Sequence, residues 1–261
     1  MTTICPAGVG RLPTKRGYEL AFQAQPGRLP WVVFLGGFRS DMEGTKAQYL
    51  ASWCKTRDQA FLRFDYSGHG QSEGRFEAGS ISLWTQDALD VLGVLSGEQC
   101  VLVGSSMGGW IMLRVALTLL DQVTGLVGIA AAPDFTRDLL LRDLSEAQRE
   151  ELRQAGSVHL SSAYDPEGFT LTTEFLEDGE KCCLLDQPIS IECPVRLLQG
   201  VKDEEVPWET ALKLSATLTG QDVSVQLLKD GDHRLSQPRQ LALIGQTLEA
   251  MLGIKDKTQH A

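Results

Sequence analysis

One serine of this chain lies in a glycine-rich stretch between two apolar runs. Gly104, Ser106 and Gly108 fit the pattern G-x-S-x-G within residues 101–110. In that pattern a tight turn joins a strand to a helix and lifts the serine hydroxyl above the sheet. The small glycines let the strand and the helix approach closely. The spacing therefore predicts that Ser106 is a nucleophile, whereas Ser105 occupies a variable position of the pattern.

A serine hydroxyl is a weak nucleophile and needs an adjacent base. The chain has four histidines. His260 lies in the tail, His159 lies in an irregular segment, and His69 lies in a loop for which we expect a structural role. His233 follows the last predicted strand, which is where a fold with such a turn places its base. We therefore expect His233 to be the general base.

A third group should orient the histidine, and an aspartate suits that role. Asp203 follows the penultimate predicted strand, and the chain order serine, aspartate, histidine agrees with the serine motif. Four other carboxylates remain as alternatives: Glu204, Glu205, Asp232 and Asp134. Asp232 is too close to His233 in the sequence to reach its ring well. Asp134 follows an earlier strand, which is an occasional position for the acid.

An acyl-transfer site also needs hydrogen-bond donors for the developing oxyanion. The backbone N–H of Met107, directly after Ser106, is one candidate. The second is the backbone N–H of Phe38, in the Gly36–Met42 loop that follows an apolar run. The alternative is that this loop is a plain glycine turn.

Alternating strand-like and helix-like segments would position these residues. Seven short apolar runs are predicted as strands, mostly buried on both faces as in a parallel sheet: Tyr18–Ala24, Trp31–Leu35, Ala60–Asp65, Cys100–Gly104, Leu126–Ala131, Val195–Gly200 and Val223–Leu228. Helical patterns separate them: Lys46–Arg57, Ser82–Leu95, Met107–Leu120, Trp208–Leu218 and Pro238–Leu252. This alternation predicts an α/β fold with helices on both faces of a mostly parallel sheet.

One segment of about 60 residues between Pro133 and Pro194 breaks the alternation. It contains helical patterns over Ser145–Ala155 and near Thr172–Leu185, and we identify it as a short helical lid. The predicted organisation is a core of residues 1–133 and 191–261 with a lid insertion at 134–190.

The lid contains apolar side chains that could line a substrate pocket, among them Phe169 and Phe175. We expect these two residues to bind an acyl chain by burial, which favours medium or long acyl groups over acetyl. The alternative is that they only pack the lid onto the core.

Composition excludes several other functions. The net charge is −10, with 24 basic and 34 acidic residues, which argues against a nucleic-acid partner. No apolar run is long enough to span a membrane. The N-terminal residues have no signal-peptide core, so we expect a cytoplasmic protein, or a mitochondrial one if a leader has been removed. The six cysteines show no zinc spacing, and we expect Cys182 and Cys183 to be free thiols rather than a redox pair. No metal and no organic cofactor is implied.

Beyond the serine motif, several strings of this sequence are similar to a known family. The G-x-S-x-G turn around Ser106 (the nucleophile elbow), the 65–72 loop and the order Ser106, Asp203, His233 resemble the α/β-hydrolase superfamily. Five strings resemble its branch of mitochondrial palmitoyl-protein thioesterases and acyl-glucuronide esterases: 37–47, 63–68, 103–110, 202–208 and 232–234. The resemblance covers about residues 29–252 and implies an acyl thioesterase or carboxylesterase. Ser106 at the elbow disfavours dehalogenases and epoxide hydrolases, which resemble this fold with an aspartate there.

These observations predict a serine hydrolase that cleaves carboxylic esters or thioesters through an acyl-enzyme on Ser106. Its expected substrate is a small-molecule ester or thioester, or an S-acylated protein. Two alternatives remain. The same triad could perform other chemistry, such as C–C hydrolysis or acyl transfer, or the chain could be a catalytically silent binding protein.

Overall fold

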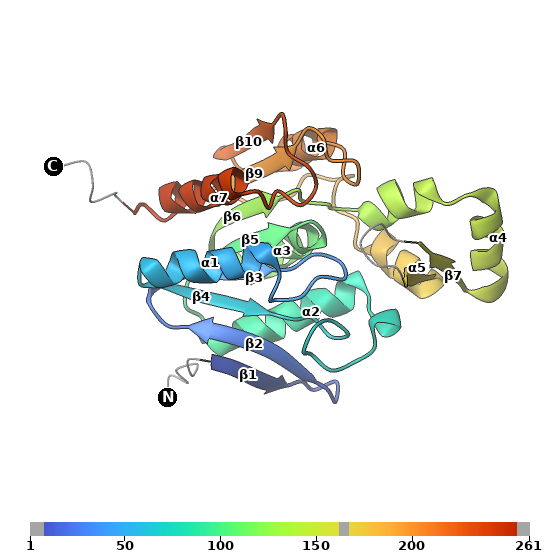
Figure 1. Cartoon of the computed structure of the whole chain (residues 1–261), viewed down its shortest axis with the longest axis horizontal. Coiled ribbons are helices and arrows are strands. Elements are labelled where there is room, and N and C mark those ends of the chain that lie inside the picture. The colour runs from blue at the N-terminus through green and yellow to red at the C-terminus, as the bar shows by residue number, and fades with distance from the viewer. Residues whose placement is uncertain (1–7, 162–166, 255–261) are drawn as a thin grey trace.

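A single eight-stranded sheet forms the centre of the molecule (Figure 1). The computed structural model describes residues 8–161 and 167–254. The strands lie in the order β1-β2-β4-β3-β5-β6-β9-β10, and only the β1–β2 and β2–β4 pairs are antiparallel. Their bounds are β1 Gly8–Pro13, β2 Glu19–Gln25, β3 Arg28–Leu35, β4 Gln59–Phe64, β5 Cys100–Ser105, β6 Val123–Ile129, β9 Val195–Gly200 and β10 Val223–Leu228.

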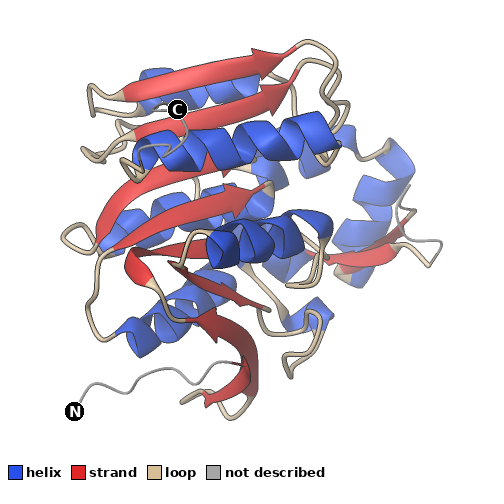
Figure 2. Ribbon diagram, turned by 60° about the vertical axis from the view of Figure 1, so that its left-hand side comes forward, coloured by secondary structure: helices blue, strands red, loops and turns tan. Residues whose placement is uncertain are grey.

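Helices cover both faces of this sheet (Figure 2). On one face α1 (Thr45–Thr56) and α7 (Pro238–Met251) bury an apolar cluster against the central strands. On the other face lie α2 (Ile81–Leu92), α3 (Met107–Thr118) and α6 (Glu209–Thr217), with the short turns η1 (Phe76–Ala78) and η2 (Gly93–Leu95). Every residue of β4 and β5 is buried, because helices cover both sides of these strands. The predicted α/β fold with a mostly parallel sheet is confirmed.

The strand prediction missed β1. Its residues, Gly8–Pro13, include two glycines and a proline and have no apolar alternation. The segment is extended because it pairs antiparallel with β2 at the edge of the sheet. Edge strands tolerate proline and polar residues, so the sequence carried little signal for this strand. The opposite edge strand, β10, is only partly buried, although its sequence resembles that of a core strand.

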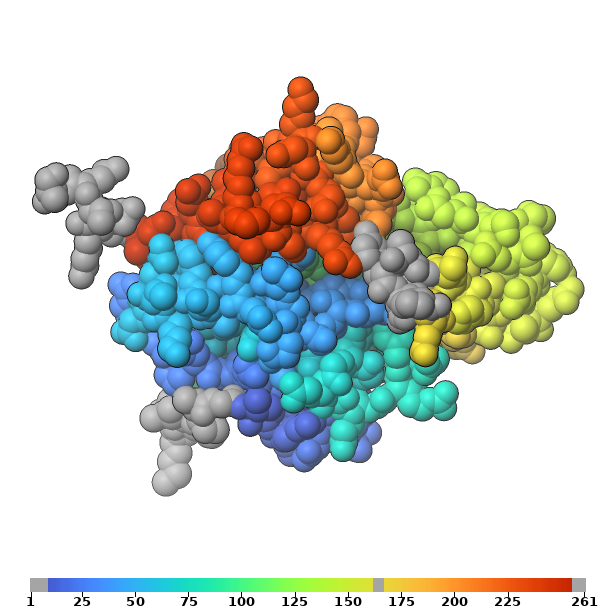
Figure 3. Space-filling model, viewed as in Figure 1, coloured from blue at the N-terminus to red at the C-terminus, as the bar shows by residue number. Residues whose placement is uncertain are grey.

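The segment that we predicted to be a lid lies at one end of the molecule, beside the sheet and its helices (Figures 1 and 3). It contains the π-helical turn η3 (Thr136–Leu141), α4 (Glu146–Ala155) and α5 (Thr173–Lys181). It is not only helical, because the strands β7 (Ser157–Leu160) and β8 (Phe169–Thr172) form an antiparallel hairpin. These four-residue strands are too short to show a reliable alternation of apolar and polar residues.

Candidate active site

Ser106 lies in the turn between β5 and α3. Its backbone φ is +55° and its ψ is −121°, a strained conformation for a residue other than glycine. A Cβ on Gly104 would meet the carbonyl oxygen of Gly108 at 2.4 Å, and a Cβ on Gly108 would meet that of Leu35 at 2.1 Å. The turn can therefore be this tight only with glycine at both positions. Ser106 stands at the N-terminus of α3, where the helix dipole favours negative charge.

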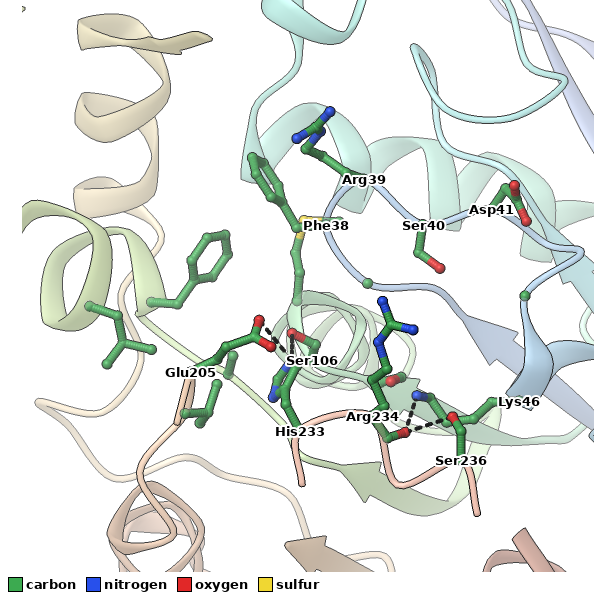
Figure 4. A pocket seen from close by; sticks show the side chains of 18 of the residues that line it. Phe38, Arg39, Ser40, Asp41, Lys46, Ser106, Glu205, His233, Arg234 and Ser236 are labelled. Carbon is green, nitrogen blue, oxygen red and sulfur yellow. Dashed lines mark hydrogen bonds and ion pairs between the residues drawn. The ribbon is translucent and has the colours of Figure 1, made fainter. Parts of the chain in front are cut away.

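The imidazole of His233 lies between Ser106 and Asp203. Its Nε2 is 3.0 Å from the hydroxyl oxygen of Ser106 (Figure 4). Its Nδ1 is 2.8 Å from Oδ2 of Asp203. The Asp203 carboxylate is buried, whereas the His233 side chain is 14% exposed. When Nδ1–H donates to the carboxylate, Nε2 is free to accept the serine proton. The structure thus brings together the three residues expected to form a triad.

Three further donors hold the Asp203 carboxylate in place. Its Oδ1 accepts from the backbone N–H groups of Glu205 and Val206, and its Oδ2 accepts from the Gln199 side chain. These bonds fix the plane of the carboxylate, because both oxygens have defined partners. Gln199 was not among the residues predicted for the site. Its position near the end of an apolar strand was a signal, since a buried polar residue there must find a partner.

Of the alternative acids, Asp232 and Asp134 make other contacts, whereas Glu204 and Glu205 line the same cavity as Ser106 and His233. Asp232 accepts from the Leu235 N–H and stabilises the turn that carries His233. Asp134 is fully buried and accepts from the N–H groups of Leu184 and Leu185, so it ties the end of the lid to the core. Glu205 approaches the other ring nitrogen of His233, with Oε2 at 3.7 Å from Nε2.

The predicted oxyanion loop passes next to Ser106. A Cβ on Gly37 would lie 3.4 Å from the Cβ of Ser106, so a larger residue would crowd the nucleophile. Within the described part of the chain, the N–H of Phe38 has no recorded acceptor. Met107 is the first residue of α3, so its N–H has no partner in the helical ladder. Both N–H groups therefore remain the candidate donors for an oxyanion at Ser106.

A buried histidine supports the oxyanion loop. Nε2 of His69 accepts a hydrogen bond of 3.2 Å from the backbone N–H of Arg39, whose φ is +58°. Nδ1 of His69 faces the carbonyl of Ser67 at 3.2 Å, so it carries the proton. Burial lowers the pKa of His69 to about 4, which keeps the ring neutral. His69 therefore has the structural role that we expected, and it holds the loop that passes next to Ser106.

A cavity of about 760 Å³ opens above Ser106. Toward the predicted lid, it is lined by the apolar side chains of Phe38, Phe135, Leu139, Leu140 and Phe169, together with the acidic Asp143. Phe175 is not among the lining residues. Its ring is buried against the rings of Phe38, Trp84 and Phe135, with centroid distances between 5.6 and 6.2 Å. Of the two phenylalanines expected to bind substrate, only Phe169 reaches the cavity.

Other predicted features have no place in the cavity. His159 is exposed on β7, and His260 lies outside the described residues. The described cysteines are all free, and burial raises the pKa of Cys182 to about 11 and that of Cys183 to about 12.

Among residues 8–161 and 167–254, no group of three or more acidic, histidine or cysteine side chains could hold a metal ion. None of the helices described there combines the length and apolar character that crossing a bilayer requires.

Comparisons with known proteins identify relatives of this chain. The family model described as serine aminopeptidase, S33 matches residues 30–164. The mitochondrial palmitoyl-protein thioesterase ABHD10 of Mus musculus is 38% identical over 235 residues, which are 90% of this chain and 79% of that protein.

Two solved structures resemble the whole chain. A putative hydrolase from Agrobacterium vitis S4 superimposes with a TM-score of 0.90 at 39% identity, and the match covers 95% of this chain and 99% of the other. The mouse alpha/beta hydrolase domain-containing protein 10 gives a TM-score of 0.87 at 35% identity, with the same coverage.

Proposed function

Since this chain belongs to the α/β-hydrolase family described as serine aminopeptidase, S33, and is related to a palmitoyl-protein thioesterase, we propose that it cleaves carboxylic esters or thioesters through an acyl-enzyme on Ser106. The observation that carries this proposal is the continuous hydrogen-bonded path from Asp203 through His233 to Ser106. An intact path of this kind argues against a catalytically silent protein.

In the proposed mechanism, the Ser106 oxygen attacks the acyl carbonyl while Nε2 of His233 takes the hydroxyl proton. The carbonyl oxygen becomes an anion that accepts hydrogen bonds from the Phe38 and Met107 N–H groups. The carbon–oxygen or carbon–sulfur bond then breaks, and the His233 imidazolium protonates the departing alcohol or thiol. A water molecule attacks the acyl-enzyme by the same steps and releases the carboxylic acid. Asp203 holds the ring and stabilises its charge throughout.

The apolar lining supports an acyl group as the part of the substrate that enters the lid side. Phe135, Leu139 and Phe169 present apolar side chains to the cavity. An acyl chain packed against them would remove apolar surface from water. Each methylene buried there contributes up to about 0.8 kcal/mol. We therefore propose a preference for medium or long acyl chains, on a small molecule or on an S-acylated protein.

A fluorophosphonate probe tests the nucleophile directly. The wild-type protein should be labelled at Ser106, and Ser106→Ala should abolish labelling and lower kcat by at least about 10³-fold. Ser105→Ala is the matched control, and it should retain both the labelling and the wild-type kcat. Labelling that survives Ser106→Ala would overturn the assignment. Rates on p-nitrophenyl esters and S-acyl peptides, from acetyl to palmitoyl, would then define the substrate class.

The compartment of this protein also needs an experiment. The related thioesterase is described by its name as mitochondrial, and we propose the mitochondrion as the first compartment to examine, with the cytoplasm as the alternative. Imaging of the full-length protein with a C-terminal fluorescent tag distinguishes the two.

A further inference from the structure

The ring of Phe38 lies at the centre of an aromatic cluster. It contacts five other rings at centroid distances from 5.0 to 6.0 Å, and four of these contacts are edge-to-face, an arrangement that aromatic rings prefer. In Figure 4 the ring extends away from Ser106. We call this group the Phe38 cluster, and its other members are Phe76 and Trp84 of the core and Phe135, Phe169 and Phe175 of the predicted lid. A residue proposed as an oxyanion donor thus has its side chain packed between the core and the predicted lid.

The residue after Phe38 is held by the same cluster. The N–H of Arg39 donates to Nε2 of His69, and the His69 ring contacts that of Trp84, with the two centroids 5.0 Å apart. The Arg39 guanidinium lies over the ring of Phe169, 5.4 Å from its centroid. The Phe38 cluster therefore restrains both the Phe38 side chain and the peptide that follows it.

The backbone that leads into Phe38 is conformationally permissive. Gly36 and Gly37 precede Phe38, and glycine has the widest backbone freedom of any residue. A Cβ on Gly36 would meet no atom within 4 Å, so nothing packs closely against that position. Among the described residues, the Phe38 N–H has no recorded acceptor that would fix its direction. The direction of this N–H therefore depends on the packing of the Phe38 ring and on the hydrogen bond at Arg39.

Phe175 shows how the predicted lid takes part in this packing. It is 5% exposed and does not line the cavity. Its ring lies 5.6 Å from the ring of Phe38 and 5.7 Å from that of Trp84, measured between centroids. Phe175 therefore reaches the candidate oxyanion loop through the Phe38 ring, and this contact exists before any substrate enters the cavity.

We propose that the ring of Phe38 is a positioning group for its own N–H, and that the predicted lid, through Phe175, completes the packing that directs this N–H at the oxyanion. This inference rests on the proposed esterase function and on the Phe38 N–H as an oxyanion donor. It gives the lid a role in the chemical step that is separate from acyl-chain binding. The lid then affects the hydrolysis of every ester, including acetyl esters, which present only a methyl group to the acyl pocket.

Hydrolysis of p-nitrophenyl acetate tests the role of the ring. Phe38→Ala keeps the N–H donor and removes the ring, so kcat should fall about tenfold or more with little change in KM, because the donor is no longer held in place. The affinity for 1,1,1-trifluoroacetone, which forms an oxyanion when Ser106 adds to it, should fall by the same factor as kcat/KM. Phe38→Leu fills part of the same space and should recover part of both losses.

A second pair of variants tests the role of the lid. Phe175→Leu should lower kcat for the acetyl ester and the affinity for the ketone, although Phe175 does not line the cavity. The double variant with Phe38→Ala should be no less active than Phe38→Ala alone, because Phe175 acts through the Phe38 ring. Phe61→Leu is the matched control: Phe61 is buried in β4, in the apolar cluster under α1 and α7, and its loss should lower stability but not kcat.

Each outcome supports or overturns the inference. If the wild type hydrolyses no ester, the proposed function fails and the inference fails with it. If the wild type is active and neither Phe38→Ala nor Phe175→Leu changes kcat or ketone affinity, the inference is overturned and the esterase function stands. A loss confined to Phe38→Ala overturns the role of the lid, and an equal loss in Phe61→Leu overturns the whole inference. If Phe38→Ala does not fold, as judged by circular dichroism, Phe38→Leu takes its place and must itself lower kcat.

Discussion

The backbone N–H of Arg39 donates a hydrogen bond to Nε2 of His69, with a distance of 3.2 Å. This bond joins two loops that follow neighbouring strands, β3 and β4. A second bond joins the same loops, because the Met42 N–H donates to the Asp65 carboxylate at 2.6 Å. The candidate oxyanion loop is therefore held at two points, and Phe38 lies just before the first of them.

We predict that His69→Phe lowers kcat roughly tenfold to a hundredfold with little change in KM, because Arg39 loses its acceptor and the Phe38 N–H shifts. His69→Gln should recover part of the loss, since an amide oxygen can accept the same bond. The measurement is kcat and KM for one p-nitrophenyl ester, together with the affinity for a trifluoromethyl ketone that mimics the oxyanion. A lower melting temperature with unchanged kcat would show that His69 only stabilises the fold.

The second prediction concerns the acid. Asp203→Asn should lower kcat by about 10² to 10⁴-fold without unfolding the protein, because the imidazole loses the charge that orients it. Asp232→Asn is the matched control, since Asp232 accepts from the Leu235 N–H and an amide oxygen can accept the same bond. Steady-state rates and circular dichroism on both variants check this. Near wild-type activity of Asp203→Asn, together with an inactive Asp134→Asn, would move the acid to the earlier strand.

The proximity of Ser106, Asp203 and His233 could be predicted from the sequence for a physical reason. All three follow predicted strands, and the carboxyl ends of parallel strands lie along one edge of a sheet. The apolar runs set the strands, and the glycines around Ser106 set the turn. Local sequence therefore contained most of the information that positions these residues.

The parts that the sequence did not predict depend on tertiary contacts. The strand β1 becomes extended because it pairs with β2, and its residues have no strong strand preference of their own. The two strands of the lid hairpin contain strand-favouring residues, but they are too short for the pattern to be recognised. The position of Phe175 follows from the aromatic cluster around Phe38, whose ring contacts the rings of Phe76, Trp84, Phe135, Phe169 and Phe175, five residues from separate segments. Sequence spacing indicated that Phe169 and Phe175 share a lid, but it did not indicate which of them faces the cavity.

These different positions give the third prediction. Phe169→Ala should remove apolar surface from the cavity and flatten the dependence of kcat/KM on acyl chain length, with a small effect on stability. Phe175→Ala should instead destabilise the protein by about 3 to 5 kcal/mol, because it leaves a void in a buried aromatic cluster. Chain-length profiles and denaturant unfolding on the pair separate the two roles. An unchanged profile for Phe169→Ala would contradict the acyl pocket.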